Sequence, residues 1–313
     1  MQIFEPLQLF AQKYSDFDHY WQLEMDCRIM GDSRHYLDRL SAFARAEPRK
    51  QALERSSFLP IPQVHGNYSS LLSAVNASLK GGGVWGPVSI PEVQHPIGPS
   101  PPTASPLDDD FQWGVGEDAD LIATTRCYPS ADYWVFHNSV SGFALGSDTR
   151  RWFCPLAVVR ASWNLLNVIH TAQVTQGLEL PSEATLVSFA VWHGLKISCP
   201  PQPVFMDPPQ DPWYIDQLLN GGPPRSENEG FSRGSITYNR TAFDEFFFAV
   251  QPTLRWSSAF PSQIRDAWLG GVTTAADGDQ ELPSMLRMHE GKVFAPNMAL
   301  HPVKTNDGPG EYC

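Results

Sequence analysis

The sequence has little basic charge, no long apolar run and no paired cysteine motif. Its 313 residues include 22 Lys and Arg against 34 Asp and Glu, which gives a formal net charge of −12. This acidic balance argues against a nucleic-acid partner. No apolar run approaches the roughly 18 residues that a membrane helix needs, and residues 1–5 lack the layout of a secretion signal. We therefore expect a soluble chain with no transmembrane segment.

The cysteines exclude two common motifs. No C-x-x-C pair occurs, so a zinc knuckle and a thioredoxin-like motif are excluded. One or two disulfides are possible, although the spacing favours free, buried cysteines. The five cysteines are odd in number and widely spaced: Cys27, Cys127, Cys154, Cys199 and Cys313.

The glycosylation sites do not decide the cellular compartment of the protein. Three Asn-x-Ser/Thr sites occur, at Asn67, Asn76 and Asn239. They matter only in the secretory pathway, where the protein would be a glycoprotein. The location is then the secretory or Golgi lumen if the full-length gene carries an anchor, and the cytoplasm otherwise.

The composition is that of a globular protein. Hydrophobic residues make up 42% of the chain, including 18 Phe and 10 Trp. We expect one α/β domain over residues 1–313, a central mixed sheet flanked by helices, with long Pro-rich irregular loops at 85–110 and 207–241. The predicted helices are 6–14, 33–46, 48–55, a short one near 71–75, 155–175 and 182–192. The predicted strands are 21–26, 195–198 and 204–206.

The most informative stretch is residues 19–28, an aromatic strand that ends in two acids. Side chains alternate across a strand, so Glu24 and Asp26 share one face and Met25 points into the core. Two carboxylates on one face suit Mg²⁺ or Mn²⁺, which complete their shells with water and substrate phosphates. This favours a platform for a metal and a diphosphate. The alternative is a strand whose last residues face water.

A second unusual stretch is residues 113–120. Gly114 and Gly116 allow positive φ or close backbone approach, and the acids that follow are expected at the start of a helix. A carboxylate placed there stays ionised, which suits a general base for a hydroxyl. The alternative is an ordinary acidic N-cap after a glycine turn.

Together the two stretches resemble the acidic motifs of GT-A glycosyltransferases. The first resembles the acid-x-acid motif, and the second resembles the W-G-x-G-E-D motif of β-1,4-galactosyltransferases. Most of the chain is also similar to a fungal family of unknown function. That similarity rests on residues 21–28, 47–55, 84–87, 113–122, 193–196 and 300–304.

The resemblance implies a donor site at the first motif. Asp26 would bind Mn²⁺ or Mg²⁺, and Glu24 would lie against the metal or the ribose. Arg28 and Lys196 would offset the charge of the diphosphate, although surface ion pairs are the plainer interpretation of both. A late histidine would complete the metal shell, and His193 and His301 are the candidates, although a structural role is the plainer interpretation of each.

The resemblance also implies an acceptor site at the second motif. Glu117 and Asp118 would contact the acceptor, and Asp118 would be the base in an inverting attack on the anomeric carbon. Only 23 residues precede Glu24, whereas GT-A proteins place a series of strands and helices before this motif. We therefore expect either a chain truncated at its N-terminus, without the nucleotide-binding half, or a chain that has lost the donor site.

Three functions follow, in order of preference. The first is a metal-dependent glycosyltransferase that takes a nucleotide-sugar donor and a glycan or small-molecule acceptor. In it a cation would stabilise the leaving diphosphate while a carboxylate deprotonates the acceptor hydroxyl. The second is a non-catalytic accessory protein that retains a decayed GT-A shell. The third is a metal-dependent hydrolase that uses the same carboxylates with water.

Overall fold

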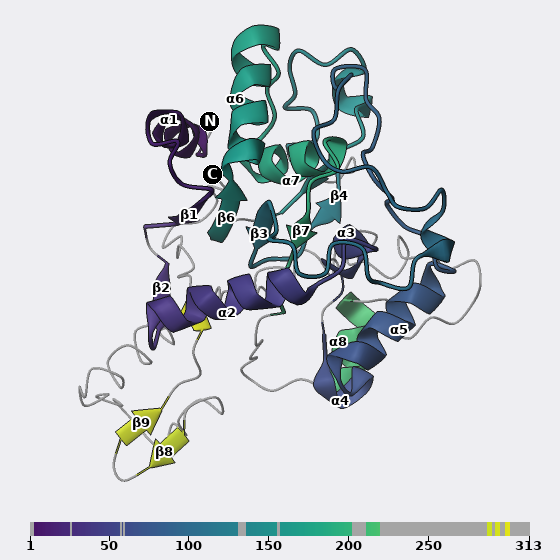
Figure 1. Cartoon of the computed structure of the whole chain (residues 1–313). Helices are drawn as coiled ribbons and strands as arrows, with labels where there is room; N and C mark the ends of the chain where they lie inside the picture. Colours follow the sequence, from purple (N-terminus) through teal and green to yellow (C-terminus); the bar gives the residue numbers. More distant parts are fainter. Residues whose placement is uncertain are drawn as a thin grey trace, which may run out of the picture.

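A four-stranded mixed sheet forms the centre of the protein (Figure 1). The computed structural model describes residues 3–25, 27–56, 58, 60–130, 136–154, 157–201, 211–219, 287–289, 292–294 and 298–300. Strand β6 is antiparallel to both of its neighbours, and β3 is parallel to β7, so β1, β3 and β7 all run in one direction. In spatial order the strands are β1 (His19–Leu23), β6 (Val158–Ser162), β3 (Leu121–Ala123) and β7 (Ile197–Ser198).

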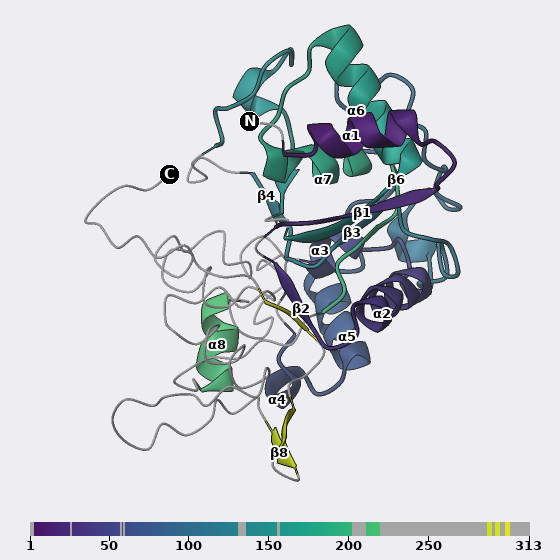
Figure 2. The same ribbon diagram turned by 90° about the vertical axis from the view of Figure 1, so that its left-hand side faces the viewer.

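Helices cover both faces of this sheet, which confirms the α/β class (Figure 2). One face carries α1 (Glu5–Lys13), α6 (Trp163–Gln176) and α7 (Ser182–Trp192). The other face carries α2 (Ser33–Ala46), and α3 (Ala52–Ser56) packs beside β7. Within the part of the chain that the structure describes, no helix is both long and apolar enough to cross a bilayer.

Alternation along the strands explains the two layers. Leu121 and Ala123 belong to the core beneath α6 and α7, whereas Ile122 packs with Tyr36 and Leu40 of α2. Strand β3 is therefore buried on both faces, and its sequence is continuously apolar as in a central strand.

The described residues also form shorter elements outside this sheet. Strand β2 (Arg28–Met30) pairs with β10 (Met298–Leu300), and β4 (Tyr128–Pro129) pairs with β5 (Trp152–Phe153). The others are α4 (Pro62–His65), α5 (Tyr68–Ser78), α8 (Pro212–Leu219), β8 (Arg287–His289), β9 (Lys292–Phe294) and the 3₁₀ turns Pro106–Asp108 and Gly146–Asp148. A polar contact between His65 Nε2 and Asp216 Oδ1, 3.1 Å apart, joins α4 to α8.

The helix predicted over 155–175 is wrong in its first third. Val158 and Val159 lie in β6, and the helix begins only at Trp163. Ser162 ends the strand and caps the helix, because its Oγ accepts the amide hydrogen of Leu165 at 3.1 Å. A short apolar run buried on both faces has no period that distinguishes strand from helix.

The prediction for the end of the first strand is also wrong. Strand β1 ends at Leu23, and Met25 is exposed to solvent instead of packing in the core. The chain leaves the ladder at Glu24, whose amide still donates to the carbonyl oxygen of Ala157 at 2.9 Å. The alternation of side chains between the two faces of the sheet therefore does not extend to Met25.

Other predictions have mixed outcomes. The helices over 33–46 and 182–192 are confirmed, with Asp32 as the N-cap of the first, whereas the helix predicted over 48–55 begins at Ala52. The loop over 85–110 is irregular except for its 3₁₀ turn. The loop over 207–241 is wrong at residues 212–219, which form α8, and most of its remainder lies outside the described residues. The strand over 204–206 also lies outside them.

A disulfide between Cys127 and Cys154 joins the segment after β3 to the segment after β5. The expectation of free, buried cysteines is therefore wrong for this pair, whereas Cys27 and Cys199 form no disulfide and are half-buried. The Sγ atom of Cys199 lies 3.6 Å from that of Cys127, so a single substitution at Cys154 would leave two thiols in contact. Cys313 lies outside the described residues.

We expect the Cys127→Ser/Cys154→Ser double variant to lose roughly 3–4 kcal/mol of unfolding free energy, because the disulfide closes a loop with a sequence separation of 27. Urea denaturation without reductant measures this difference. Cys27→Ser, which makes the same change at a cysteine outside any disulfide, is the control. Equal urea midpoints for the wild type and the double variant would contradict the assignment.

Candidate functional site

The two acidic stretches lie at opposite ends of β1. Ser162, the partner of His19, donates its amide hydrogen to the carbonyl oxygen of Asp120 at 2.7 Å. At the other end of the strand Glu24 donates to Ala157. Because a strand rises about 3.3 Å per residue, roughly 13–16 Å separate these ends.

We name these two ends of the sheet by strand direction. The amino edge is where β1, β3 and β7 begin, and it includes residues 113–120 and 193–196. The carboxyl edge is where the same strands end, and among the described residues it includes 24–25, 27–30 and 124–128. The structure therefore brings Glu117 and Asp118 together at the amino edge, and it does not bring them to Glu24.

Residues 113–118 form a tight loop at the amino edge, as the glycines predict. Gly114 and Gly116 have φ of +86° and +88°. A Cβ atom added at Gly114 would lie 2.5 Å from Cγ of Arg49, so this glycine is required by both conformation and space. The loop is thus held close against the start of α3.

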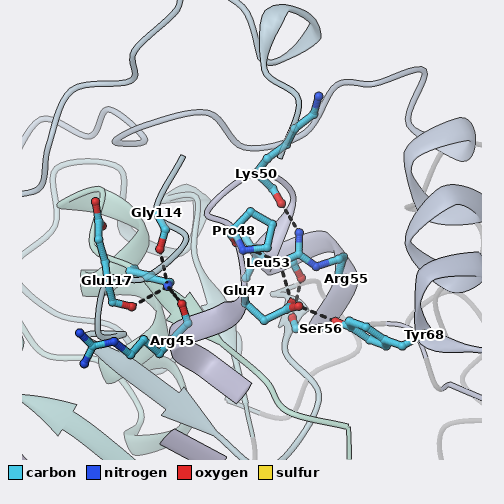
Figure 3. A network of polar contacts seen from close by, with 11 residues as sticks. Arg45, Glu47, Pro48, Lys50, Leu53, Arg55, Ser56, Tyr68, Gly114 and Glu117 are labelled. Atoms are coloured by element: carbon cyan, nitrogen blue, oxygen red, sulfur yellow. Dashed lines mark hydrogen bonds and ion pairs between the residues drawn. The ribbon is translucent and has the colours of Figure 1, made fainter. Parts of the chain in front are cut away.

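Lys196 anchors the loop from beneath. Its side chain is 1% exposed, and its Nζ donates to the carbonyl oxygens of Gly114 at 2.6 Å, Glu117 at 2.7 Å and Arg45 at 3.3 Å (dashed lines in Figure 3). Three donors of an ammonium group meet three acceptors. Burial and then the nearby charge of Arg49 lower the pKa of Lys196 to about 8, so it remains mostly protonated at neutral pH. A surface ion pair was the wrong expectation for this residue.

The two predicted catalytic carboxylates are paired with arginines. Oε2 of Glu117 lies 2.9 Å from both Nε and Nη2 of Arg49, and Oδ2 of Asp118 lies 3.3 Å from Nη1 of Arg45. The side chains of Glu117 and Asp118 are 47% and 45% exposed. The prediction that they begin a helix is wrong, because β3 follows and its residues are buried on both faces.

Asp120 is the residue of this motif that sequence reasoning missed. Its Oδ1 accepts the hydroxyl hydrogen of Ser162 at 2.8 Å, and its Oδ2 accepts the amide hydrogen of Lys196 at 2.9 Å. One carboxylate therefore joins the ends of β6, β3 and β7. The feature of the sequence that could have identified Asp120 is its position directly before the apolar strand.

Aromatic side chains line the loop. Trp113 and Trp85 meet edge to face with centroids 4.7 Å apart, and the Arg49 guanidinium lies 5.4 Å from the centre of the Trp113 ring. Arg49 also donates to the carbonyl oxygen of Gly194 at 3.1 Å. Arg49 is thereby fixed by an aromatic ring, a carboxylate and a carbonyl group.

A second polar network lies under α3, also drawn in Figure 3. Nη2 of Arg55 lies 2.9 Å from Oε2 of Glu47, and the hydroxyl of Tyr68 donates to the same oxygen at 2.9 Å. Arg55 also donates to the carbonyl oxygens of Lys50 and Pro48. This buried pair ties the end of α2 to α3 and is too deep to contact a ligand.

His193 lies at the amino edge, four residues before β7, and is therefore not beside Glu24. Its side chain is buried against the Phe189 ring, with centroids 6.3 Å apart, and burial lowers its pKa. It lines a groove of about 620 Å³ between α6 and residues 91–97. The structure thus separates it from the predicted metal platform.

The carboxyl edge brings the late part of the chain to the first motif. Strand β10 pairs with β2, so that Leu300 lies opposite Arg28 and Ala299 opposite Ile29. Leu300 is the residue before His301. Asp26, His301 and the side chain of Arg28 lie outside the described residues.

No group of three or more His, Cys, Asp or Glu side chains suited to a metal gathers among the residues that the structure describes. Of the predicted ligands at the carboxyl edge, only Glu24 belongs to those residues. The chemistry of the predicted set, two carboxylates and one imidazole from segments joined by the β2–β10 ladder, does suit Mn²⁺ or Mg²⁺.

A family model described as "Protein of unknown function (DUF3405)" matches residues 1–305. No curated protein and no solved structure matches the chain.

We expect Lys196→Met to lower the unfolding free energy by about 3 kcal/mol or more, because it leaves one buried and two partly buried carbonyl groups without their donor. Urea denaturation measures the loss. Lys13→Met, on the exposed side of α1, is the control and should change stability by about 0.5 kcal/mol at most. A loss for Lys196→Met as small as that of the control would show that Lys196 does not anchor the loop.

Proposed function

The chain belongs to the DUF3405 family of proteins of unknown function, and we propose that it is a metal-dependent glycosyltransferase of the GT-A type. It would move a sugar from a nucleotide-sugar donor to a hydroxyl group of a glycan or small molecule. The donor site would lie at the carboxyl edge of the sheet.

The observation that carries this proposal is the ladder between β2 and β10. It joins the segment that follows Glu24 and Asp26 to the segment that precedes His301, although these lie far apart in the sequence. Ala299 is 1% exposed and packs in the core beneath α2, so β10 is held firmly in place. In the sequence, two of the predicted ligands therefore lie shortly before β2 and the third directly follows β10, the two strands of one ladder.

The direction of the strands supports the same edge. In open α/β sheets, ligands bind outside the carboxyl ends of the parallel strands. Strands β1, β3 and β7 all end at the edge where Glu24 leaves β1. Chain segments after three strands can thus contribute side chains to one ligand.

The chain's own residues would bind and orient the donor there. Glu24, Asp26 and His301 would hold the cation, whose role when bound is to neutralise charge on the leaving diphosphate. Glu24 would be positioned by the hydrogen bond from its amide to Ala157, which fixes the backbone as it leaves the sheet.

The geometry favours a structural role for Asp118. The resemblance implies that Asp118 is the acceptor base, yet its carboxylate pairs with Arg45 at the amino edge. Roughly 13–16 Å separate that edge from the donor edge, too far for direct proton transfer to a shared reacting centre. We therefore assign Glu117 and Asp118 to the loop, and we expect the base at the carboxyl edge.

One observation favours the accessory-protein alternative. Both exposed acids of the second motif already have arginine partners, as carboxylates with a structural role do. A decayed shell would keep such pairs and lose donor binding. The hydrolase alternative differs only in the acceptor, because water would replace the hydroxyl group.

We expect UDP to bind the wild-type protein at least about tenfold more tightly with Mn²⁺ than without it, because the cation bridges carboxylates and phosphates. Asp26→Asn should abolish the effect of Mn²⁺. Isothermal titration calorimetry measures both affinities. Asp118→Asn is the matched control, since it makes the same change at the other edge of the sheet and should keep metal-dependent binding.

Absence of UDP binding to the wild type would refute the transferase proposal for uridine-linked donors and support the accessory alternative. With binding established, donor turnover assays separate the two enzymes. Sugar transfer to an added acceptor identifies a transferase, whereas donor cleavage without transfer identifies a hydrolase. Loss of transfer in Asp118→Asn, with donor cleavage intact, would restore Asp118 as the acceptor base.

A further inference from the structure

A buried arginine near the carboxyl edge has no counter-charge among the residues that the structure describes. Arg126 is 7% exposed, and its Nη1 and Nη2 atoms are both buried without a hydrogen-bond partner. None of the ion pairs of the described residues includes Arg126. Its guanidinium lies 5.6 Å from the centre of the Tyr128 ring.

Other buried arginines of this protein do have oxygen partners. Arg55 donates to Glu47, Arg151 donates to the carbonyl oxygen of Thr149 at 2.8 Å, and Arg160 donates to that of Ala119 at 2.9 Å. Arg126 is therefore an exception that the general packing of arginines in this fold does not explain.

A buried guanidinium whose two terminal nitrogens have no hydrogen-bond acceptor requires an anion. Arginine keeps its proton in proteins, so burial cannot be relieved by loss of the charge. Contact with an aromatic ring uses the face of the guanidinium and leaves its N–H groups without acceptors. A buried charge is costly unless it is paired and hydrogen-bonded.

The position of Arg126 is next to the proposed donor site. The amide of Thr124 donates to the carbonyl oxygen of Val158 at 3.3 Å, and the amide of Glu24 donates to that of Ala157. The segments that leave β3 and β1 therefore flank the same end of β6. Arg126 follows Thr124 by two residues, on the side where the strands end.

We propose that Arg126 binds a phosphate group of the donor at the carboxyl edge. The planar fork of Nη1 and Nη2 matches two phosphate oxygens, and a charge-assisted pair satisfies both orphaned donors. This assignment rests on the proposed transferase function for the identity of the ligand as a nucleotide diphosphate. The need for an anion rests on Arg126 alone.

Inorganic pyrophosphate is the probe, used without divalent cations and at constant ionic strength set with chloride. We expect it to raise the melting temperature of the wild-type protein and to bind Arg126→Met roughly tenfold to a hundredfold more weakly. Arg39→Met is the control, because it removes an equal charge from the exposed side of α2 and should bind like the wild type. Equal affinity for the wild type and Arg126→Met would overturn the proposal.

The unliganded variants provide a second readout. Methionine fills much of the space of arginine without a charge, so free Arg126→Met should melt at or above the temperature of the free wild type. Arg126→Lys keeps the charge but lacks the fork, and it should bind pyrophosphate more weakly than the wild type. A much lower melting temperature for free Arg126→Met would show that Arg126 is already satisfied, and would overturn the proposal.

Two outcomes distinguish the anion site at Arg126 from the proposed donor site. Arg126-dependent binding of pyrophosphate without any binding of UDP and Mn²⁺ would support the anion site and refute the uridine-linked donor. Metal-dependent binding of UDP with equal affinity in Arg126→Met would support the donor site and refute the role of Arg126.

Discussion

The buried ammonium group of Lys196 is the interaction on which the amino edge of this protein depends. It lies among the carbonyl groups of Arg45, Gly114 and Glu117, and so joins the end of α2 and the loop before β3 to the start of β7. Asp120 connects β6 to the same edge, because its carboxylate accepts the hydroxyl hydrogen of Ser162. One charged group therefore holds three segments of the chain together at this edge. The exposed carboxylates of Glu117 and Asp118 lie on the resulting rigid loop, and each is paired with an arginine.

Strand direction supports our proposal that the ligand binds at the other edge of the sheet. Strands β1, β3 and β7 end together, and the segments that follow β1 and β3 carry Glu24 and Arg126. The ladder between β2 and β10 adds the segment before His301. The carboxyl edge thus combines the carboxylate of Glu24 with the guanidinium of Arg126, whose terminal nitrogens lack an acceptor. A carboxylate suits a cation, and a guanidinium suits a phosphate.

Much of the fold follows from sequence patterns, and the rest depends on contacts that no local pattern contains. The helix over 33–46 was predictable because its apolar stripe and cap are local, and the positive φ of Gly114 and Gly116 followed from residue type. Strand β6 was not predictable, because a short run buried on both faces has no period. The partners of Lys196 and the isolation of Arg126 come from segments distant in sequence, so only the folded chain reveals them.

Hydrogen–deuterium exchange of the wild-type protein, with and without UDP and Mn²⁺, tests whether the ligand binds at the carboxyl edge. We expect slower exchange on ligand addition in peptides covering residues 24–30 and 124–128, with residues 113–118 unchanged. Slower exchange confined to residues 113–118 would exclude binding at the carboxyl edge and would place the ligand at the loop that Lys196 anchors.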